Sequence, residues 1–224
     1  MKKIKDNGKV VLLHGIGLNH LYMASLERYL QKAGYDTLNI HYPSVKENIG
    51  SLTVWLAERL EELEVWQNAQ SVHFVGHSMG GLVIGGYLQN NKHCIPADKM
   101  GRVVMLGTPH HGSEIADFLQ QNPLYKWGFG PAGQELTLMA RAQEQIVPWY
   151  DLGIIAGTKN GYHPLGMLCI NGVNDGCVSL ESTKLEGMRD HISLPVMHVS
   201  LAWSPAVHRQ VRHFLKNGEF VSEK

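Results

Sequence analysis

Short apolar runs alternate with helix-like segments along most of this chain, and no other feature constrains its fold as strongly. The runs at residues 10–13 (VVLL) and 103–106 (VVML) are continuously apolar and rich in valine. Runs of this kind are typical of strands that are covered on both faces, as in a parallel sheet. Strands that alternate with helices form such a sheet. We therefore predict an α/β fold with a mostly parallel central sheet and helices on both faces.

The same pattern assigns residue ranges to the individual elements. Strands are predicted at residues 10–13, 37–40, 72–75, 103–106, 154–156 and 192–196, and helices at residues 21–33, 52–63, 80–88 and 206–215. Between residues 112 and 148 the alternation stops, and helical periodicity is weak. A chain of this length suits one domain. We expect residues 1–224 to form that domain, with a cap insertion at about residues 112–148.

The charge balance argues against two classes of partner. Twenty basic and twenty acidic side chains leave no net charge, and so provide no attraction to nucleic acid or to an anionic membrane. No apolar stretch approaches the ~20 residues of a membrane-spanning helix. We expect neither nucleic-acid binding nor stable membrane insertion, and nothing in the sequence indicates an oligomeric state.

Cysteine usage and the N-terminal sequence bear on the compartment. Cys94, Cys169 and Cys177 cannot all pair within the chain, and none belongs to a Cys-x-x-Cys motif. The first apolar run ends at His14, which is too short for the core of a signal peptide. A reducing compartment is the simplest interpretation, and we expect a cytoplasmic protein.

One serine occupies a position that is typical of a catalytic nucleophile. Ser78 is the centre of the sequence GHSMG at residues 76–80, directly after a predicted buried strand and directly before a predicted helix. A G-x-S-x-G sequence in this context forms a sharp turn that exposes the serine hydroxyl. Gly76 and Gly80 are expected there because a Cβ would collide with the neighbouring strand or helix. The alternative is an ordinary Gly/Ser turn that joins the two elements.

Two backbone amides are predicted to stabilise a developing oxyanion. The sequence HGIG at residues 14–17 follows the first predicted strand, where the N–H of Ile16 would face the nucleophile. Met79 begins the helix after Ser78, and the N-terminus of a helix favours negative charge. The flanking residues that we expect to border the substrate are His14, Gly15, Gly17 and His77.

A carboxylate is needed to orient the imidazole of a catalytic histidine. Asp175 lies in the sequence NDG, after the strand predicted at residues 154–156. An Asx turn would explain the same sequence without catalysis. Asp151 and Asp190 remain as competing carboxylates.

The base is expected in the loop after the last strand, and His198 lies there. The order serine, acid, histidine along the chain is then complete. His191 would lie at the beginning of that strand, at the wrong end of a parallel sheet, because ligands gather at the carboxyl ends. His208 and His213 lie within the closing helix. No metal or cofactor is needed for such a cycle, and the histidines lack metal-ligand spacing.

Taken together, these residues resemble the bacterial lipases and esterases of the α/β-hydrolase superfamily, particularly the small lipases with little or no lid. The resemblance spans most of the chain. It rests on residues 13–17 (LHGIG), 76–81 (GHSMGG), 106–113 (LGTPHHGS), 174–176 (NDG) with Val178, and His198 with Trp203, Ser204 and the final helix.

The resemblance implies the α/β-hydrolase fold and a triad of Ser78, Asp175 and His198, with Asp175 preferred over Asp151. It implies that residues 108–113 shape the rim of the site and that His110 and His111 are structural. The expected reaction is hydrolysis of a small-molecule carboxylic ester with an apolar acyl group. Because no export signal is recognisable, a carboxylesterase acting inside the cell is a safer expectation than a secreted lipase.

Other interpretations of the same residues stay open. An acyltransferase or a thioesterase could use the same triad, and a non-catalytic hydrolase-like binding protein is the alternative outside enzymes. Four aromatic residues of the expected cap region either line an acyl pocket or pack against the sheet. They are Tyr125, Trp127, Phe129 and Trp149.

Overall fold

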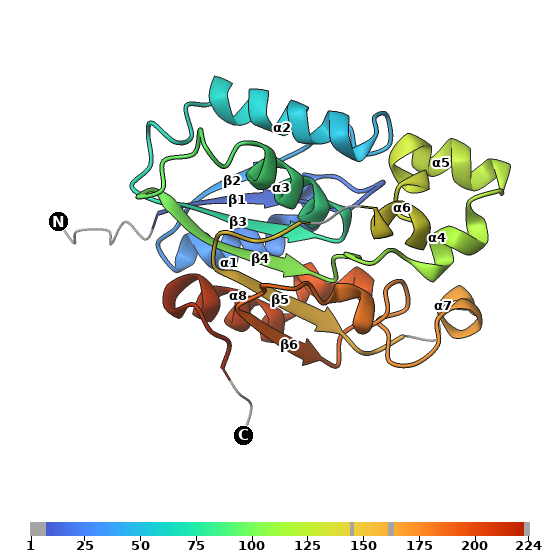
Figure 1. Cartoon of the computed structure of the whole chain (residues 1–224). Coiled ribbons are helices and arrows are strands. Elements are labelled where there is room, and N and C mark those ends of the chain that lie inside the picture. The colour runs from blue at the N-terminus through green and yellow to red at the C-terminus, as the bar shows by residue number, and fades with distance from the viewer. Residues whose placement is uncertain (1–7, 144–145, 161–163, 222–224) are drawn as a thin grey trace.

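The structure, a computed structural model, describes residues 8–143, 146–160 and 164–221 (Figure 1). Its centre is a six-stranded sheet with the order β2-β1-β3-β4-β5-β6, in which all neighbouring strands are parallel. The predicted parallel sheet is confirmed. The strands are β1 (Lys9–Leu13), β2 (Asp36–Ile40), β3 (Val72–His77), β4 (Met100–Leu106), β5 (Leu152–Gly157) and β6 (Asp190–Leu194).

Helices cover both faces of the sheet, as the alternation predicts. α1 (Ala24–Lys32) and α8 (Pro205–Asn217) pack on one face, and α2 (Ile49–Glu62) and α3 (Met79–Asn90) pack on the other (Figure 1). Successive side chains of β1 point to opposite faces, so that Val10 and Leu12 join the core under α1 and α8. Val11 and Leu13 join the core under α2 and α3. Two covered faces explain why this strand is apolar at consecutive positions.

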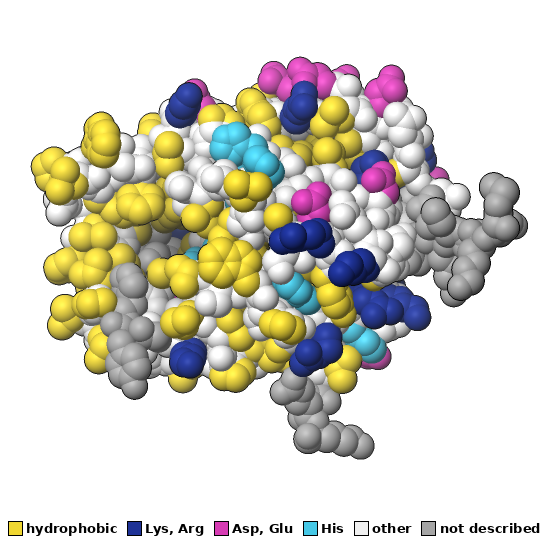
Figure 2. Space-filling model, turned by 180° about the vertical axis from the view of Figure 1, so that it is seen from behind, with side chains coloured by type: hydrophobic (Ala, Val, Ile, Leu, Met, Phe, Trp, Pro, Cys, Tyr) yellow, Lys and Arg dark blue, Asp and Glu magenta, His cyan; other side chains and the backbone are white. Residues whose placement is uncertain are grey.

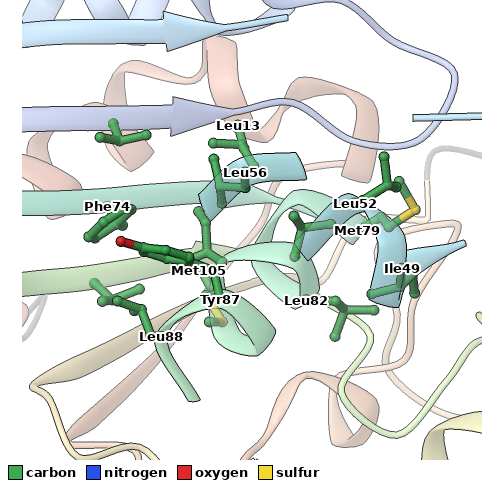
Figure 3. Packing of buried hydrophobic residues seen from close by; sticks show 14 of the residues in the cluster. Leu13, Ile49, Leu52, Leu56, Phe74, Met79, Leu82, Tyr87, Leu88 and Met105 are labelled. Atoms are coloured by element: carbon green, nitrogen blue, oxygen red, sulfur yellow. The ribbon is translucent and has the colours of Figure 1, made fainter. Parts of the chain in front are cut away.

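The core under α2 and α3 is built from large aliphatic and aromatic side chains (Figure 3). Leu52 and Leu56 from α2 and Leu82 from α3 belong to this cluster, together with the buried ring of Phe74 from β3. Each side chain of this size contributes roughly 1.5–3 kcal/mol to folding when fully buried. This core holds α3 firmly against the sheet, which fixes the residue that precedes the helix.

The strand order determines where loops come together. β1 lies between β2 and β3, so the chain leaves β1 toward one edge of the sheet and returns to its other side. In open parallel sheets, ligands bind outside the carboxyl ends of the strands at such a reversal. The loops that follow β1 and β3 therefore begin side by side.

The expected cap region forms short helices beyond the carboxyl ends of the strands (Figure 1). Weak periodicity there reflects their shortness and a kink at Gly130 within α5, where φ is 59°. The helices of this part of the fold are α4 (Glu114–Leu119), α5 (Pro123–Gln134), α6 (Leu138–Ala142) and, later in the chain, α7 (Pro164–Cys169). Three 3-10 turns complete the fold: η1 (His20–Met23), η2 (Glu181–Thr183) and η3 (His198–Trp203).

Most element boundaries differ from the prediction by a few residues, and one predicted helix is divided. The helix expected at residues 21–33 is divided into η1 and α1. The last strand ends at Leu194 rather than at residue 196, because Pro195 has no N–H to donate to the sheet. None of the helices in the described ranges combines the length and apolar character that crossing a membrane requires.

Candidate functional site

A cleft of about 840 Å³ opens at the carboxyl edge of the sheet, between the loops after β1 and β3 and the helices α4 and α5. Figure 2 shows apolar side chains gathered around a hollow at this end of the molecule. Among the described residues, no Asp, Glu, Lys or Arg lines the cleft. Its apolar wall includes Ile16, Ala116, Leu119, Tyr125, Phe129, Leu136, Val178 and Trp203.

Ser78 lies in the cleft, at the turn between β3 and α3. Its φ of 53° and ψ of −126° fall in a backbone region that residues other than glycine rarely adopt. Hydrogen bonds hold this strained residue. Its N–H donates to the carbonyl of Leu106 at 2.8 Å, and its carbonyl accepts from the Thr108 hydroxyl at 3.0 Å.

The glycines around Ser78 are required by close packing. A Cβ on Gly76 would lie 2.6 Å from the backbone of Gly81, and a Cβ on Gly80 would lie 2.5 Å from the His14 carbonyl oxygen. Separations this short force the backbone to move. The expected collision of a Cβ with the neighbouring strand or helix is thus confirmed at both positions.

The backbone amides of Ile16 and Met79 are free to donate. In the part of the chain that the structure describes, neither N–H has a hydrogen-bond acceptor. The next amide in the first loop is occupied, because Gly17 donates its N–H to the Ser44 hydroxyl at 3.1 Å. Ile16 lines the same cleft as Ser78, and Met79 is the residue after Ser78 at the start of α3. Unpaired N–H groups are the kind of donor that stabilises a negatively charged oxygen.

Asp175 and His198 are directly hydrogen-bonded. The Nδ1–H of His198 donates to Asp175 Oδ2 at 2.7 Å, and the His198 N–H donates to the Asp175 carbonyl at 2.9 Å. The other carboxylate oxygen, Oδ1, accepts from the N–H groups of Cys177 at 3.0 Å and Val178 at 2.8 Å. Asp175 therefore both makes a local turn and orients an imidazole, so the two interpretations of the NDG sequence coexist.

Ser78 and His198 both line the cleft. Among the hydrogen bonds of the described residues, none joins Ser78 Oγ to His198 Nε2. Catalytic hydrogen bonds of this kind commonly form or shorten only when substrate binds.

Gly107, with φ 58°, lies against the side chains of Asp175 and His198. A Cβ there would be 3.0 Å from His198 Nδ1 and 3.1 Å from Asp175 Oδ2, so no side chain fits.

The competing carboxylates and histidines lie elsewhere. Asp151 forms ion pairs with Arg102 at 3.3 Å and Arg189 at 3.1 Å, at the amino end of β5. Asp190 and His191 begin β6, also at the amino edge of the sheet. The geometry brings only Asp175, of the three candidate acids, to the histidine loop.

The residues expected to border the substrate divide into two groups. Gly15, Gly17 and His77 line the cleft. His14 does not, because its ring is fully buried and stacked 4.5 Å from the ring of Tyr42. Burial lowers the pKa of His14 to about 4, so the ring is neutral near pH 7. The expectation that His14 contacts substrate therefore does not fit its position.

The aromatic residues of the cap region also divide. Tyr125 and Phe129 line the cleft and pack against each other with ring centroids 4.9 Å apart. Trp127 lies on the outer side of α5, and its side chain is 87% exposed. Trp149 lies at the opposite edge of the sheet, where its indole N–H donates to the Leu88 carbonyl. Only two of the four aromatic residues are thus available to an acyl group.

Sequence reasoning missed Tyr22, whose buried hydroxyl lies next to the histidine loop. Its 3-10 turn has no periodicity to reveal which way the ring points. The expected structural character of His110 fits its burial, which together with Arg141 and His111 lowers its pKa to about 3.

Cys94, Cys169 and Cys177 are all free thiols. Burial and the nearby Asp175 raise the pKa of Cys177 to about 12, so its sulfur stays protonated although it lines the cleft. Within the described ranges, no three His, Cys, Asp or Glu side chains are grouped so that they could hold a metal ion.

Comparison with known proteins gives a family and one curated relative. A family model for the alpha/beta hydrolase fold matches residues 9–141. A stretch of 101 residues, 44% of this chain, is 27% identical to Triacylglycerol lipase 2 of Saccharomyces cerevisiae. That stretch spans 30% of the yeast protein, so most of the yeast protein has no counterpart in the match.

Similar solved structures share the fold at low identity. The mature form of the Bacillus licheniformis lipase BlEst2 matches with a TM-score of 0.75 and 20% identity, over 95% of this chain and 92% of that one. The RedJ thioesterase from the prodiginine biosynthetic pathway of Streptomyces coelicolor matches with a TM-score of 0.61 and 13% identity, over 93% and 84% of the two chains.

Proposed function

Because the chain belongs to the alpha/beta hydrolase fold family, we propose that it is a serine hydrolase that cleaves carboxylic esters. Ser78 is the nucleophile, His198 the general base and then acid, and Asp175 the group that orients His198. The N–H groups of Ile16 and Met79 stabilise the oxyanion. The similarity to lipases in sequence and in fold supports ester hydrolysis over other reactions of this family.

One observation carries the proposal: the hydrogen bond of 2.7 Å between Asp175 and His198 borders the same cleft as Ser78. A buried carboxylate on Nδ1 fixes the tautomer that leaves Nε2 free to take a proton. Ser78, held in a strained turn, exposes its hydroxyl to that cleft. Neither the turn nor the Asp–His pair has another evident use.

The reaction follows from these positions. His198 Nε2 takes the proton of Ser78 Oγ as this oxygen attacks the ester carbonyl carbon, and the two amides hold the resulting oxyanion. The bond to the alcohol oxygen breaks, and His198 gives its proton to the departing alcohol. Water, deprotonated by His198, then attacks the acyl-enzyme. Ser78 regains its proton, and the carboxylic acid leaves.

The lining of the cleft supports an uncharged ester with an apolar acyl group. An acyl chain in the cleft would contact Leu119, Tyr125 and Leu136, and the described lining residues offer no charged partner. We also propose that the whole chain is one domain in which residues 112–148 form a cap insertion. The helices α4 and α5 would then determine which acyl groups fit.

The direct test is hydrolysis of p-nitrophenyl esters from acetyl to octanoyl by the parent protein and by Ser78→Ala. Loss of the nucleophile should lower kcat by several orders of magnitude. Ser113→Ala is the matched control, because Ser113 also lines the cleft but donates its hydroxyl to the Cys177 carbonyl. Equal activity of the parent and Ser78→Ala, with both folded, would remove the support for this function.

Thioester cleavage and acyl transfer use the same residues. The similarity in fold to the RedJ thioesterase makes thioesters the first alternative to compare. Matched oxygen and sulfur esters of one acyl chain separate these two activities by kcat/KM. Added alcohols that divert the acyl group from water would indicate a transferase.

A further inference from the structure

Two buried side chains that also line the cleft form hydrogen bonds to the backbone of His198. Tyr22 of η1 and His77 of β3 converge on the backbone carbonyl of His198. The Tyr22 hydroxyl lies 3.2 Å from this oxygen, and His77 Nε2 lies 3.1 Å from it. The three residues come from segments 55 and 121 positions apart in sequence.

The chemistry of the carbonyl fixes the direction of these hydrogen bonds. A carbonyl oxygen only accepts, so His77 carries its proton on Nε2, and the Tyr22 hydroxyl donates its single proton to the same oxygen. Tyr22 Oη also lies 3.1 Å from His77 Nε2, where it accepts part of the Nε2–H hydrogen bond. The other ring nitrogen, His77 Nδ1, has no partner among the described residues. Burial, together with the neighbouring His198 and His14, lowers the pKa of His77 well below its usual value.

The backbone of His198 is therefore held at both of its polar groups. Its N–H donates to the Asp175 carbonyl at 2.9 Å, while its carbonyl accepts from Tyr22 and His77. The ring of His77 also packs against the rings of Tyr22 and His198, with centroids 4.6 and 4.8 Å apart. Trp203 completes the arrangement by donating its indole N–H to the Tyr22 carbonyl at 2.9 Å.

We propose that Tyr22 and His77 are positioning residues that hold the backbone of His198 so that its ring stays aligned between Asp175 and Ser78. This inference rests on the proposed function. It gives His77 a structural task next to the nucleophile, in addition to its place in the lining of the cleft. Displacement of a reacting group by about 1 Å can cost on the order of 100-fold in rate, which makes such support effective.

Tyr22→Phe is the first variant, because it removes one donor and keeps the ring. We expect kcat to fall about tenfold, as for the loss of one hydrogen bond, with KM for a short ester unchanged. Tyr150→Phe is the matched control, since the buried Tyr150 hydroxyl lies at the opposite edge of the sheet and has no partner among the described residues. A rise in KM with kcat unchanged, or equal effects in both variants, would overturn the proposal.

Replacement of His77 provides a rescue experiment. His77→Gln keeps an N–H donor close to the position of Nε2, whereas His77→Leu keeps bulk without a donor. We expect His77→Gln to retain most of the kcat that His77→Leu loses, at equal folded fractions by circular dichroism. If the two variants turn over equally, the N–H of His77 does not position His198.

Proton NMR tests the arrangement without any turnover. The Nδ1–H of a histidine bonded to a carboxylate resonates far downfield, and Asp175→Asn identifies this signal by abolishing it. We expect the signal to persist in Ser78→Ala and to broaden or shift in Tyr22→Phe and His77→Leu. An unchanged signal in both would refute the positioning role. A perturbed signal in a protein that hydrolyses no ester would instead refute the proposed function alone.

Discussion

The two walls of the cleft are built on different principles. On the sheet side, hydrogen bonds to specific partners hold Ser78, Asp175 and His198 in place. On the side of α4 and α5, the wall consists of apolar contacts from residues such as Leu119 and Leu136. Hydrogen bonds require partners at fixed positions, whereas apolar contacts tolerate changes of shape. The sheet wall therefore suits a reaction, and the helical wall suits a choice among substrates.

The largest effect is expected from the sheet wall. Asp175→Asn should lower kcat about 10⁴-fold, because an amide in place of the carboxylate favours the wrong tautomer of His198. Steady-state kinetics on p-nitrophenyl acetate measures this change. Asp151→Asn is the control, since Asp151 pairs with arginines at the other edge of the sheet. If Asp151→Asn lost as much activity as Asp175→Asn, the assignment of the acid would be wrong.

A change on the helical wall should alter selectivity and spare the chemistry. Ala116 is buried on α4 and lines the cleft. Ala116→Phe fills part of the cavity, so kcat/KM for octanoyl esters should fall about 10–100-fold, while acetyl esters are affected little. Phe118→Ala, on the exposed side of the same helix, is the control. Equal losses for both ester lengths would show that this wall does not select the acyl chain.

The sequence predicts the sheet wall far better than the helical wall. Ser78 and His198 directly follow predicted strands of one parallel sheet, so their meeting at one edge follows from topology. Trp127 could not be placed in this way, because the direction of its side chain depends on the packing of short helices and on the kink at Gly130. Tyr22 could not be placed because its contacts are with residues far away in sequence.

Histidines buried near the cleft make the stability of the fold sensitive to acid. Burial lowers the pKa of His110, which precedes α4, to about 3. As pH falls below the ordinary histidine value of 6.5, the unfolded chain binds a proton that the folded protein excludes. The free energy of unfolding should thus decrease by up to about 1.4 kcal/mol per pH unit for this residue, from pH 6.5 toward pH 3.

Urea unfolding at several pH values measures this slope. His110→Leu should flatten it between pH 6.5 and pH 4, whereas His93→Gln, at an exposed position, should leave it as in the parent. His14, which is buried outside the cleft, should continue to contribute in both variants, since its pKa is lowered to about 4. An identical slope in all three proteins would show that His110 is not held neutral.

The smallest effect is expected from the outer surface of the helical wall. Trp127 is 87% exposed on α5, so Trp127→Gln should change the free energy of unfolding by less than about 0.5 kcal/mol. Hydrolysis of short, dissolved esters should stay within about twofold of the parent, since a surface side chain outside the cleft leaves the reaction geometry unchanged. A larger loss of activity would mean that the functional part of this wall extends beyond the cleft lining.

The amides of Ile16 and Met79 have a consequence for genetics. Every amino acid except proline supplies the same N–H, so a comprehensive substitution library would report tolerance at both positions for groups proposed to stabilise the oxyanion. Gly15 and Gly80 beside them would instead score as essential for reasons of packing, because a Cβ would lie 2.9 Å from His77 Nδ1 and 2.5 Å from the His14 carbonyl oxygen. Semisynthesis that exchanges one of these peptide bonds for an ester bond replaces the N–H by an oxygen atom and keeps the side chain, so it tests the donor directly. Both proposed oxyanion donors thus belong to the main chain, where every amino-acid substitution except proline leaves them in place.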